Sequence, residues 1–141
     1  RDLHLSIRRQ RQMCIRDRLM NEQSEFAKTG GIHASVLIDE VGTVIATRED
    51  VGRHNALDKL LGHTIQNGLL NIKVQFIACS GRLNFELVQK GLMANIGIMA
   101  GVGAPTSLAV DLAKRFDMTL LGFVKESGFN IYNNKKRIVL S

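Results

Sequence analysis

Residues 74–124 read VQFIACSGRLNFELVQKGLMANIGIMAGVGAPTSLAVDLAKRFDMTLLGFV, and this stretch decides the fold. Three short apolar runs, at 74–79, 96–102 and 118–124, alternate with helix-like segments at 85–95 and 108–116. Runs of this length that are almost entirely apolar are typical of strands buried on both faces of a sheet. Short connections between alternating strands and helices favour parallel strands joined by right-handed crossovers. The stretch therefore predicts a β-α-β-α-β unit.

The residues upstream of this unit predict an antiparallel hairpin. Residues 32–39 alternate in the manner of a strand. One face of this strand carries Ile32, Ala34, Val36 and Ile38, and the other carries His33, Ser35 and Leu37. A turn at 40–42 leads to a second strand at 43–47. We expect the hairpin to lie beside the parallel strands.

Two further helices and a last strand complete the expected elements. One helix spans 19–28 and ends at Thr29-Gly30-Gly31. Another begins at residue 51 or 52 and ends at residue 67, before Gly68. A short strand is expected at 129–132. We therefore predict an α/β fold, a three-layer α/β sandwich with a mixed sheet.

Length and composition indicate one globular domain. The chain has 141 residues, of which 45% are hydrophobic. No apolar run approaches the roughly 20 residues needed to span a bilayer, and no secretory signal is evident. Cys14 and Cys79 lie 65 positions apart, which gives neither a disulfide framework nor metal-ligand spacing. These features predict a cytoplasmic protein.

The positive charge is concentrated near the start of the chain. Of the net charge of +6, residues 1–18 contribute +4, from six arginines and two aspartates, so the other residues contribute +2. Residues 1–18 contain no aromatic side chain that could stack on a base, which argues against nucleic-acid binding. Their pattern shares no periodicity with the rest. We interpret them as an atypical arginine-rich leader, disordered or non-native, ahead of an N-terminally truncated α/β domain at 19–141.

The densest group of ionisable residues lies at 48–59, which reads REDVGRHNALDK. This block stands at the junction between an expected strand and an expected helix. Two interpretations are open. The block is a ligand site, since functional residues are commonly held on loops of a rigid scaffold. Alternatively, Asp50 is an N-cap and the remaining charges form a salt-bridged first helical turn.

Ligands of open α/β sheets bind beyond the carboxyl ends of the strands. The residues that follow the expected strands are Glu49, Asp50, Arg53, His54 and Asn55; Cys79, Ser80, Gly81 and Arg82; Gly103, Ala104, Pro105, Thr106 and Ser107; and Lys125, Glu126, Ser127 and Gly128. Three of these segments precede a helix, whose free N–H groups favour an anion. Arg53, Arg82 and Lys125 add positive charge, and arginine can bind phosphate with two hydrogen bonds. The pattern predicts an anionic ligand that carries a phosphate.

Several of these residues also have plain structural interpretations. Ser80 is a candidate cap for the next helix, and Glu86 a candidate partner for Arg82 at i, i+4 spacing. Residues 104–107 resemble an N-cap preceded by a proline turn. Cys79 is expected to be an inert core thiol, and His63 to lie on the surface or in packing. Met93 and Met99 are expected in the core.

Taken together, the motifs resemble one family. They are Thr29-Gly30-Gly31-Ile32-His33-Ala34, the block at 48–59, Ser80-Gly81-Arg82 with the residues at 85–90, Ala104-Pro105-Thr106-Ser107-Leu108-Ala109, and Leu121-Gly122-Phe123 with the residues at 129–132. In this order and with these gaps, from about Leu19 to Ile138, the chain is similar to the FdhD/NarQ formate dehydrogenase accessory sulfurtransferases.

The resemblance implies a fold like that of cytidine deaminases and a role in cofactor maturation. Members of the family accept sulfur as a persulfide from a cysteine desulfurase. They pass it to the molybdenum bis(molybdopterin guanine dinucleotide) cofactor of formate dehydrogenase, and the resemblance suggests a homodimer. The zinc chemistry of deaminases does not transfer, because the sequence has no H-x-E with P-C-x-x-C.

The resemblance and the strand-end positions together give the expected site. The candidate cofactor-binding residues are Asp50, Arg53, Ser80, Gly81, Arg82, Ala104, Pro105, Ser107, Phe123, Val124, Lys125, Glu126, Ser127 and Gly128. The resemblance implies that the segment 123–128 contacts the nucleotide. Arg53, Arg82 and Lys125 are expected to hold phosphates. His33, His54 and Asn55 are expected to orient the sulfur acceptor.

The sequence departs from the family pattern in one respect. The family carries its sulfur on a cysteine loop, usually C-x-x-C, upstream of the Thr-Gly-Gly motif, and this chain contains no such loop. Cys14 stands near that position, in a different context. We therefore interpret the chain as the carboxy-terminal part of a sulfurtransferase, with no catalytic cysteine loop. The alternative is a non-catalytic module that binds the molybdenum cofactor or a guanine nucleotide; a nucleotide-hydrolysing or deaminating enzyme is disfavoured by the lack of metal ligands.

Overall fold

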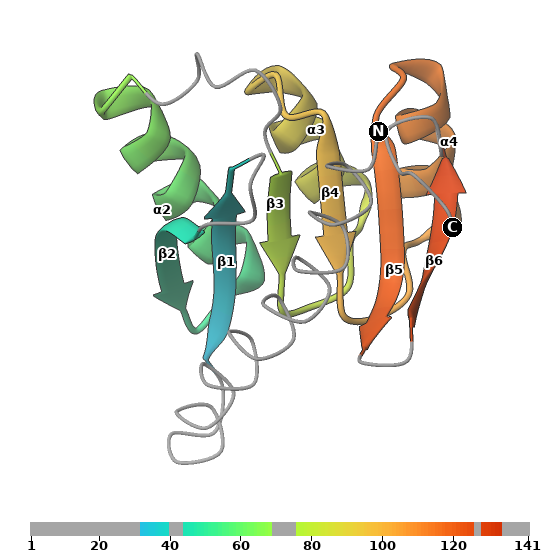
Figure 1. Cartoon of the computed structure of the whole chain (residues 1–141), viewed down its shortest axis with the longest axis horizontal. Coiled ribbons are helices and arrows are strands. Elements are labelled where there is room, and N and C mark those ends of the chain that lie inside the picture. Colours follow the sequence, from blue (N-terminus) through green and yellow to red (C-terminus); the bar gives the residue numbers. More distant parts are fainter. Residues whose placement is uncertain (1–31, 40–43, 69–75, 126–127, 134–141) are drawn as a thin grey trace.

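The computed structural model describes residues 32–39, 44–68, 76–125 and 128–133, and Figure 1 shows their arrangement. In chain order the elements are β1 (His33–Ile38), β2 (Val44–Asp50), α2 (Arg53–Gln66), β3 (Phe76–Cys79), α3 (Phe85–Met93), β4 (Ile98–Gly101), α4 (Ser107–Arg115), β5 (Thr119–Lys125) and β6 (Gly128–Asn133). The helix predicted at 19–28 and the turn predicted at 40–42 lie outside the described residues, as does the predicted leader at 1–18. Each described element was predicted in kind and approximate position.

The strands form one mixed sheet in the order β2-β1-β3-β4-β5-β6. β3, β4 and β5 are parallel neighbours, as the alternation of strands and helices predicts. β1 is antiparallel to both β2 and β3, so the predicted hairpin extends the parallel part. β6 returns antiparallel to β5. The predicted α/β class with a mixed sheet is confirmed.

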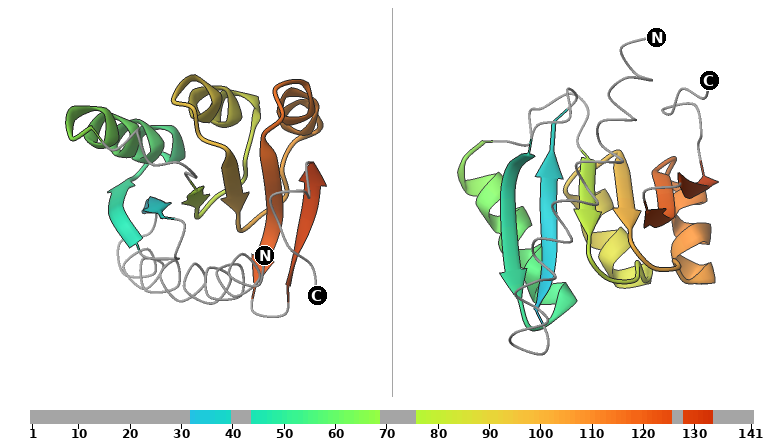
Figure 2. Two further views of the ribbon diagram at one scale, coloured as in Figure 1. Left: turned by 45° about the horizontal axis from the view of Figure 1, so that its top comes forward. Right: turned by 60° about the horizontal axis from the view of Figure 1, so that its bottom comes forward.

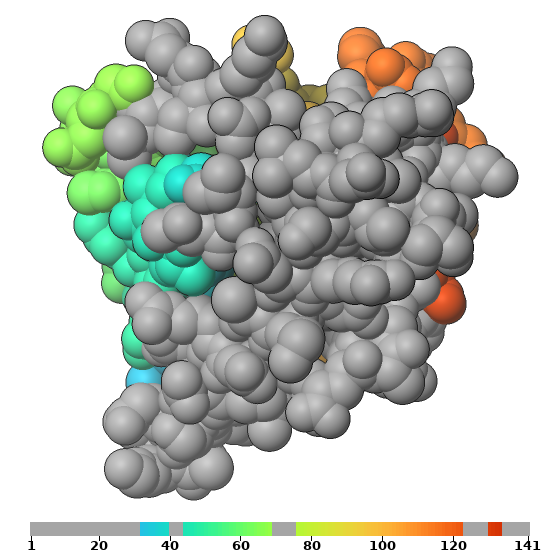
Figure 3. All heavy atoms as spheres, in the orientation of Figure 1, coloured from blue at the N-terminus to red at the C-terminus, as the bar shows by residue number. Residues whose placement is uncertain are grey.

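The three helices of the described residues lie on one face of the sheet (Figure 2). Their buried side chains pack with strand residues such as Leu37, Ile77 and Met99 in one core. A second buried cluster, which includes Val36, Phe76 and Ile98, lies on the opposite face of the strands. In the space-filling view, α2 and β2 reach the surface at one side of the molecule and α4 at the other (Figure 3). The described residues thus supply two layers of the predicted sandwich.

The ends of two elements differ from the sequence-based expectation. β2 was expected to end at residue 47, but it continues to Asp50, because Asp50 still pairs with His33 of β1. β2 is the edge strand of the sheet, where charged side chains can reach solvent. Met93 was expected in the core, but it ends α3 and is 82% exposed, whereas Met99 is fully buried as expected.

No helix among residues 44–68 and 76–125, where all the described helices lie, combines the length and the apolar character that crossing a lipid bilayer requires.

Gly122 allows the β4–α4 loop to cross β5 closely. A Cβ atom at this position would lie 2.8 Å from Cδ of Pro105 and 2.9 Å from Cε2 of Tyr132. It would also lie 3.3 Å from the carbonyl oxygen of Gly103. Carbon atoms do not approach each other this closely without displacement, and the proline ring cannot rotate away as a flexible side chain could. Gly122 therefore sets the position of residues 103–105.

We predict that Gly122→Ala destabilises the protein by about 1–3 kcal/mol, because the new methyl group overpacks this contact. Gly62→Ala is the matched control. Gly62 lies inside α2, and among the described residues a Cβ atom there would meet nothing within 4 Å beyond its chain neighbours and the backbone of its own helix, so alanine should stabilise the protein by about 0.5–1 kcal/mol. Urea unfolding of both variants measures the two changes. Equal free energies of unfolding for Gly122→Ala and the parent protein would contradict the packing argument.

Candidate functional site

The sheet topology brings the predicted site segments to one edge, which we call the carboxyl edge. β3, β4 and β5 are parallel, so their carboxyl ends lie together. β1 begins at this edge, because Ser35 pairs with Cys79 near the end of β3. β2 ends there, because Asp50 pairs with His33. The four predicted segments therefore share one edge, as ligand-binding segments of α/β sheets do.

The segment 80–84 is anchored from two sides. Ser80 N–H donates to the carbonyl of Ala34 at 3.0 Å, and Ala34 N–H donates to the Ser80 hydroxyl at 2.9 Å. Further along, the backbone N–H of Thr106 donates to the carbonyl of Leu83 at 3.0 Å, and the Leu83 side chain is fully buried. The segment is thereby fixed to β1 and to the start of α4.

Ser80 does not cap α3, so its predicted capping role is wrong. The cap is Asn84, whose Oδ1 accepts from the N–H of Leu87 at 2.9 Å. The Ser80 hydroxyl instead accepts from the backbone of Ala34. The predicted cap within residues 104–107 is confirmed, since Thr106 Oγ1 accepts from Ala109 N–H at 3.2 Å.

His33, Gly81 and Arg53 meet at the carboxyl edge, and we call this group the Arg53 corner. A Cβ atom at Gly81 would lie 3.4 Å from Nδ1 of His33 and 3.6 Å from Cδ of Arg53. Arg53 Nε is buried and has no hydrogen-bond partner among the described residues. A buried donor without an acceptor is unusual, because the loss of its hydration costs about 1–3 kcal/mol. The corner thus offers positive charge and an unused donor.

Asp50 is held by its own block rather than by the Arg53 corner. Its carboxylate forms a 2.8 Å ion pair with Lys59 and accepts from the N–H of Gly52 at 2.9 Å. The hydrogen bond from Lys59 is the main reason that the pKa of Asp50 falls from 3.8 to about 2, and those from Gly52 and Asn55 add to the shift. The predicted N-cap role of Asp50 is wrong, because Gly52 occupies that position and has no side chain to cap the helix.

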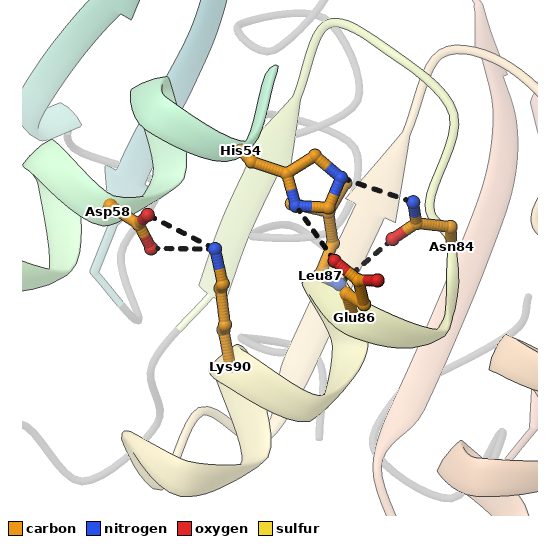
Figure 4. Close-up of polar contacts among 6 residues, drawn as sticks. All are labelled: His54, Asp58, Asn84, Glu86, Leu87 and Lys90. Carbon is orange, nitrogen blue, oxygen red and sulfur yellow. Dashed lines mark hydrogen bonds and ion pairs between the residues drawn. The ribbon is translucent and has the colours of Figure 1, made fainter. Parts of the chain in front are cut away.

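Other charges of the block also tie elements together. Asp58 of α2 pairs with Lys90 of α3 at 3.0 Å (Figure 4). Arg48 of β2 lies with one guanidinium nitrogen 2.8 Å from Nδ1 of His63, which places His63 in packing as predicted. Both interpretations of the block therefore describe part of it. Most of its charges hold the fold, and Arg53 faces the carboxyl edge.

His54 faces the start of α3. Its Nε2 lies 3.3 Å from Nδ2 of Asn84, and its Nδ1 lies 3.7 Å from Oε2 of Glu86 (Figure 4). Glu86 was expected to pair with Arg82, but it lies beside His54, and Arg82 precedes the helix that i, i+4 pairing would need. Asn55, the third expected supporting residue, is exposed.

The remaining candidates lie along the same edge. Arg82 is exposed, and its Cγ atom would lie 3.0 Å from a Cβ at Gly103. Ala104 and Pro105 are half-buried in the loop, and Ser107 is the exposed first residue of α4. The backbones of Phe123, Val124 and Lys125 end β5 and that of Gly128 begins β6, while their side chains, together with Glu126 and Ser127, lie outside the described part.

Cys79 is the cysteine within the described residues, and its surroundings make it unreactive. It is 3% exposed, and its Sγ lies 3.5 Å from Oγ of Ser35. Burial raises its pKa from 9.0 to about 11, and the contact with Ser35 offsets this only in part. A thiol with such a pKa is almost wholly protonated at neutral pH, and the thiolate is the nucleophilic form. This agrees with the expected inert core thiol.

Asn84 was not singled out from the sequence, and Gly122 appeared only within the Leu121-Gly122-Phe123 motif, with no packing role assigned to it. Asn84 precedes an expected helix at residue 85, so its preference for N-caps is a signal that could have found it. Its contact with His54 joins residues 30 positions apart and has no local signal. Gly122 lies inside an apolar strand, where an isolated glycine can mark a close backbone approach.

Lys59→Met should move the pKa of Asp50 from about 2 towards 3.8, because it removes the largest cause of the shift. A depressed carboxyl pKa contributes stability that is present above 3.8 and is lost as the pH falls towards 2. The NMR titration of the Asp50 carboxyl carbon measures the change. Lys90→Met, which removes the partner of Asp58, is the matched control and should leave the Asp50 midpoint in place.

In a Cys14→Ser background, we predict that Cys79 resists a maleimide at pH 8 in the folded protein and reacts at once in guanidinium chloride. At three pH units below a pKa of about 11, roughly one thiol in a thousand is ionised, and burial slows access further. Mass spectrometry follows the labelling. Rapid labelling of the folded protein would contradict the buried, protonated thiol.

Comparison with known proteins places the chain in a family. The profile of the FdhD/NarQ family matches residues 1–139. The match does not distinguish residues 1–18 from the rest of the chain, and their separation as a leader stays a prediction. The chain is 48% identical over 124 residues to a protein of Streptomyces avermitilis named sulfur carrier protein FdhD. The aligned region covers 88% of this chain and 44% of that protein. It is 42% identical over 123 residues to the protein of the same name from Picrophilus torridus, and this aligned region covers 87% of this chain and 47% of that protein.

A solved structure agrees with these relatives. It comes from Desulfotalea psychrophila and is described as a formate dehydrogenase accessory protein. Its TM-score with this chain is 0.83 at 29% sequence identity, over 93% of this chain and 57% of the other. The chain spans less than half the length of the two curated relatives named above. The profile match and these relatives show that the chain belongs to the FdhD/NarQ family.

Proposed function

We propose that this chain supplies the nucleotide-binding part of a sulfur carrier that serves formate dehydrogenase maturation. The observation that carries the proposal is the Arg53 corner. Within the described part of the chain, Arg53 Nε is buried without an acceptor, and Gly81 leaves space beside it that a side chain would fill. A phosphate oxygen is the kind of acceptor that such a donor prefers, because a hydrogen bond between charged groups is stronger than a neutral one.

The proposed ligand is the guanine dinucleotide of the molybdenum bis(molybdopterin guanine dinucleotide) cofactor. This molecule is the client of the sulfur carrier rather than a resident group. Arg53 and Arg82 would hold its phosphates, with the backbone of Gly81 between them. Lys125 would add a third cation from the end of β5. His33, beside Gly81, would face the same ligand.

The names of the relatives support a sulfur carrier that serves formate dehydrogenase maturation, and the sulfur donor, the cofactor and the homodimer are further parts of the proposal. In the proposed reaction the sulfur comes from a cysteine desulfurase and passes to the cofactor before formate dehydrogenase receives it, and the carrier acts as a homodimer. Cys79 is poorly suited to carry this sulfur, because its thiol is buried and protonated. We therefore assign cofactor binding to the Arg53 corner and sulfur carriage to a residue other than Cys79.

The same observation favours a second candidate, a cofactor-binding module that does not itself carry sulfur. A radiolabelled persulfide assay with a cysteine desulfurase separates the two. Label retained on the chain and lost in Cys14→Ser would support a carrier. Absence of label, together with nucleotide binding, would support the binding module. Label on Cys79 would contradict the assignment made above.

Guanosine diphosphate is the probe for the proposed site. We expect Arg53→Ala to weaken its binding at least tenfold, since removing one charge-assisted hydrogen bond costs roughly 1.5–3 kcal/mol. Arg82→Ala should also weaken binding. Isothermal titration calorimetry on the full chain measures the affinities.

Arg115→Ala is the matched control for this experiment. Arg115 is an exposed arginine in the last turn of α4, at the opposite end of that helix from the carboxyl edge. Its removal lowers the net charge by the same amount and should leave the affinity unchanged. Undetectable binding by the parent chain, or equal losses in Arg53→Ala and Arg115→Ala, would refute the proposed site.

A further inference from the structure

The side-chain amide of Asn84 has a fixed orientation. Its Oδ1 caps α3 by accepting from Leu87 N–H at 2.9 Å, so its Nδ2 is the atom that faces His54. An amide nitrogen donates hydrogen bonds and does not accept them. The 3.3 Å contact between Asn84 Nδ2 and His54 Nε2 therefore makes Nε2 the acceptor. Figure 4 shows the cap and this contact together.

The acceptor role of Nε2 decides the tautomer of His54. In a neutral imidazole one ring nitrogen accepts and the other carries the proton, so the proton of His54 is on Nδ1. Nδ1 faces Glu86, whose Oε2 lies 3.7 Å away. This separation is too long for a direct hydrogen bond, but the negative charge favours the proton on that side of the ring. The two neighbours thus select the same form of the ring.

We infer that His54, as the neutral Nδ1–H tautomer, is a positioning residue that holds Asn84 and with it the segment 80–84. Both nitrogens of the ring face protein groups, so we assign it no contact with the ligand. Asn84 ends the segment that carries Arg82 and caps the start of α3. The contact therefore ties α2 to the loop at the centre of the carboxyl edge.

The place of His54 in the chain gives this tie a consequence for the site. His54 directly follows Arg53 in the first turn of α2. A contact that holds His54 against Asn84 therefore also limits how far the backbone of Arg53 can move relative to Gly81 and Arg82. The inference that the tie affects ligand affinity rests on the proposed function. The tautomer and its cause do not depend on any ligand.

Long-range proton–nitrogen NMR of the full chain, labelled with nitrogen-15 in histidine, tests the tautomer at a pH where the imidazoles are neutral. We expect the Nδ1–H pattern for His54, identified by its loss in His54→Gln. His63 is an internal reference of opposite form, because Arg48 can only donate to its Nδ1. An Nε2–H pattern for His54 in the parent chain would overturn the inference.

Asn84→Asp separates the tie from the cap. Aspartate caps a helix as well as asparagine does, but its carboxylate cannot donate to His54. We expect His54 to change to the Nε2–H tautomer or to the imidazolium in this variant, while His63 keeps its pattern. Retention of α3 is checked by the amide resonances of its residues. An unchanged His54 pattern in folded Asn84→Asp would show that Asn84 does not control the ring.

Guanosine diphosphate affinity tests the positioning role. His54→Gln keeps a carbonyl oxygen that can accept from Asn84, so its affinity should stay within about twofold, whereas His54→Leu should weaken binding about tenfold. Equal affinities in the two variants would refute the role. If the parent chain does not bind the nucleotide, the proposed function fails, and the tautomer experiments still decide whether Asn84 and His54 are tied as inferred.

Discussion

The reciprocal hydrogen bonds between Ser80 and Ala34 are the constraint on which the site depends. They join the end of β3 to the start of β1 through two backbone N–H groups and one hydroxyl. Because Ser80 is fixed, Gly81 must pass beside His33, and the chain must then turn so that Leu83 enters the core. The loop is therefore part of the rigid sheet edge, although it has no regular secondary structure. A rigid loop can hold a ligand without the entropy cost of ordering it first.

The block at 48–59 shows how one sequence motif can serve both fold and site. Lys59 reaches back to Asp50 and to the carbonyl of Glu49, and so fixes the end of β2 against α2. Asp58 reaches sideways to Lys90 of α3. Exposed ion pairs of this kind contribute little stability individually, typically 0 to about 1 kcal/mol. Their value here lies in geometry, since they orient the first turn of α2, which carries Arg53 and His54.

The elements could be predicted from the sequence because their signals are local. The apolar runs that became β3, β4 and β5 and the alternation that became β1 are each contained within a few residues, and the order of strands and helices implies the parallel pairing. The contacts that shape the site are not local. The pairing of His33 with Asp50 extends β2 three residues past its expected end. The Ser80 hydroxyl accepts from Ala34, 46 positions away, and His54 meets Asn84 across 30 positions. Such partners can be assigned only when both ends of the contact are placed in space.

The distribution of acidic side chains explains why Arg53 keeps an unused donor within the described part of the chain. Asp50 and Asp58 lie within five positions of Arg53 in the chain, and Glu86 lies beside His54, the next residue of α2. Asp50 instead pairs with Lys59, Asp58 pairs with Lys90, and Glu86 faces His54. Each of these three acids is thereby directed to another basic group. An arginine whose Nε is buried without an acceptor carries a desolvation cost of about 1–3 kcal/mol, and an incoming oxyanion would remove that cost as it binds. The fold thus keeps these acids away from the place where an anionic ligand would need positive charge.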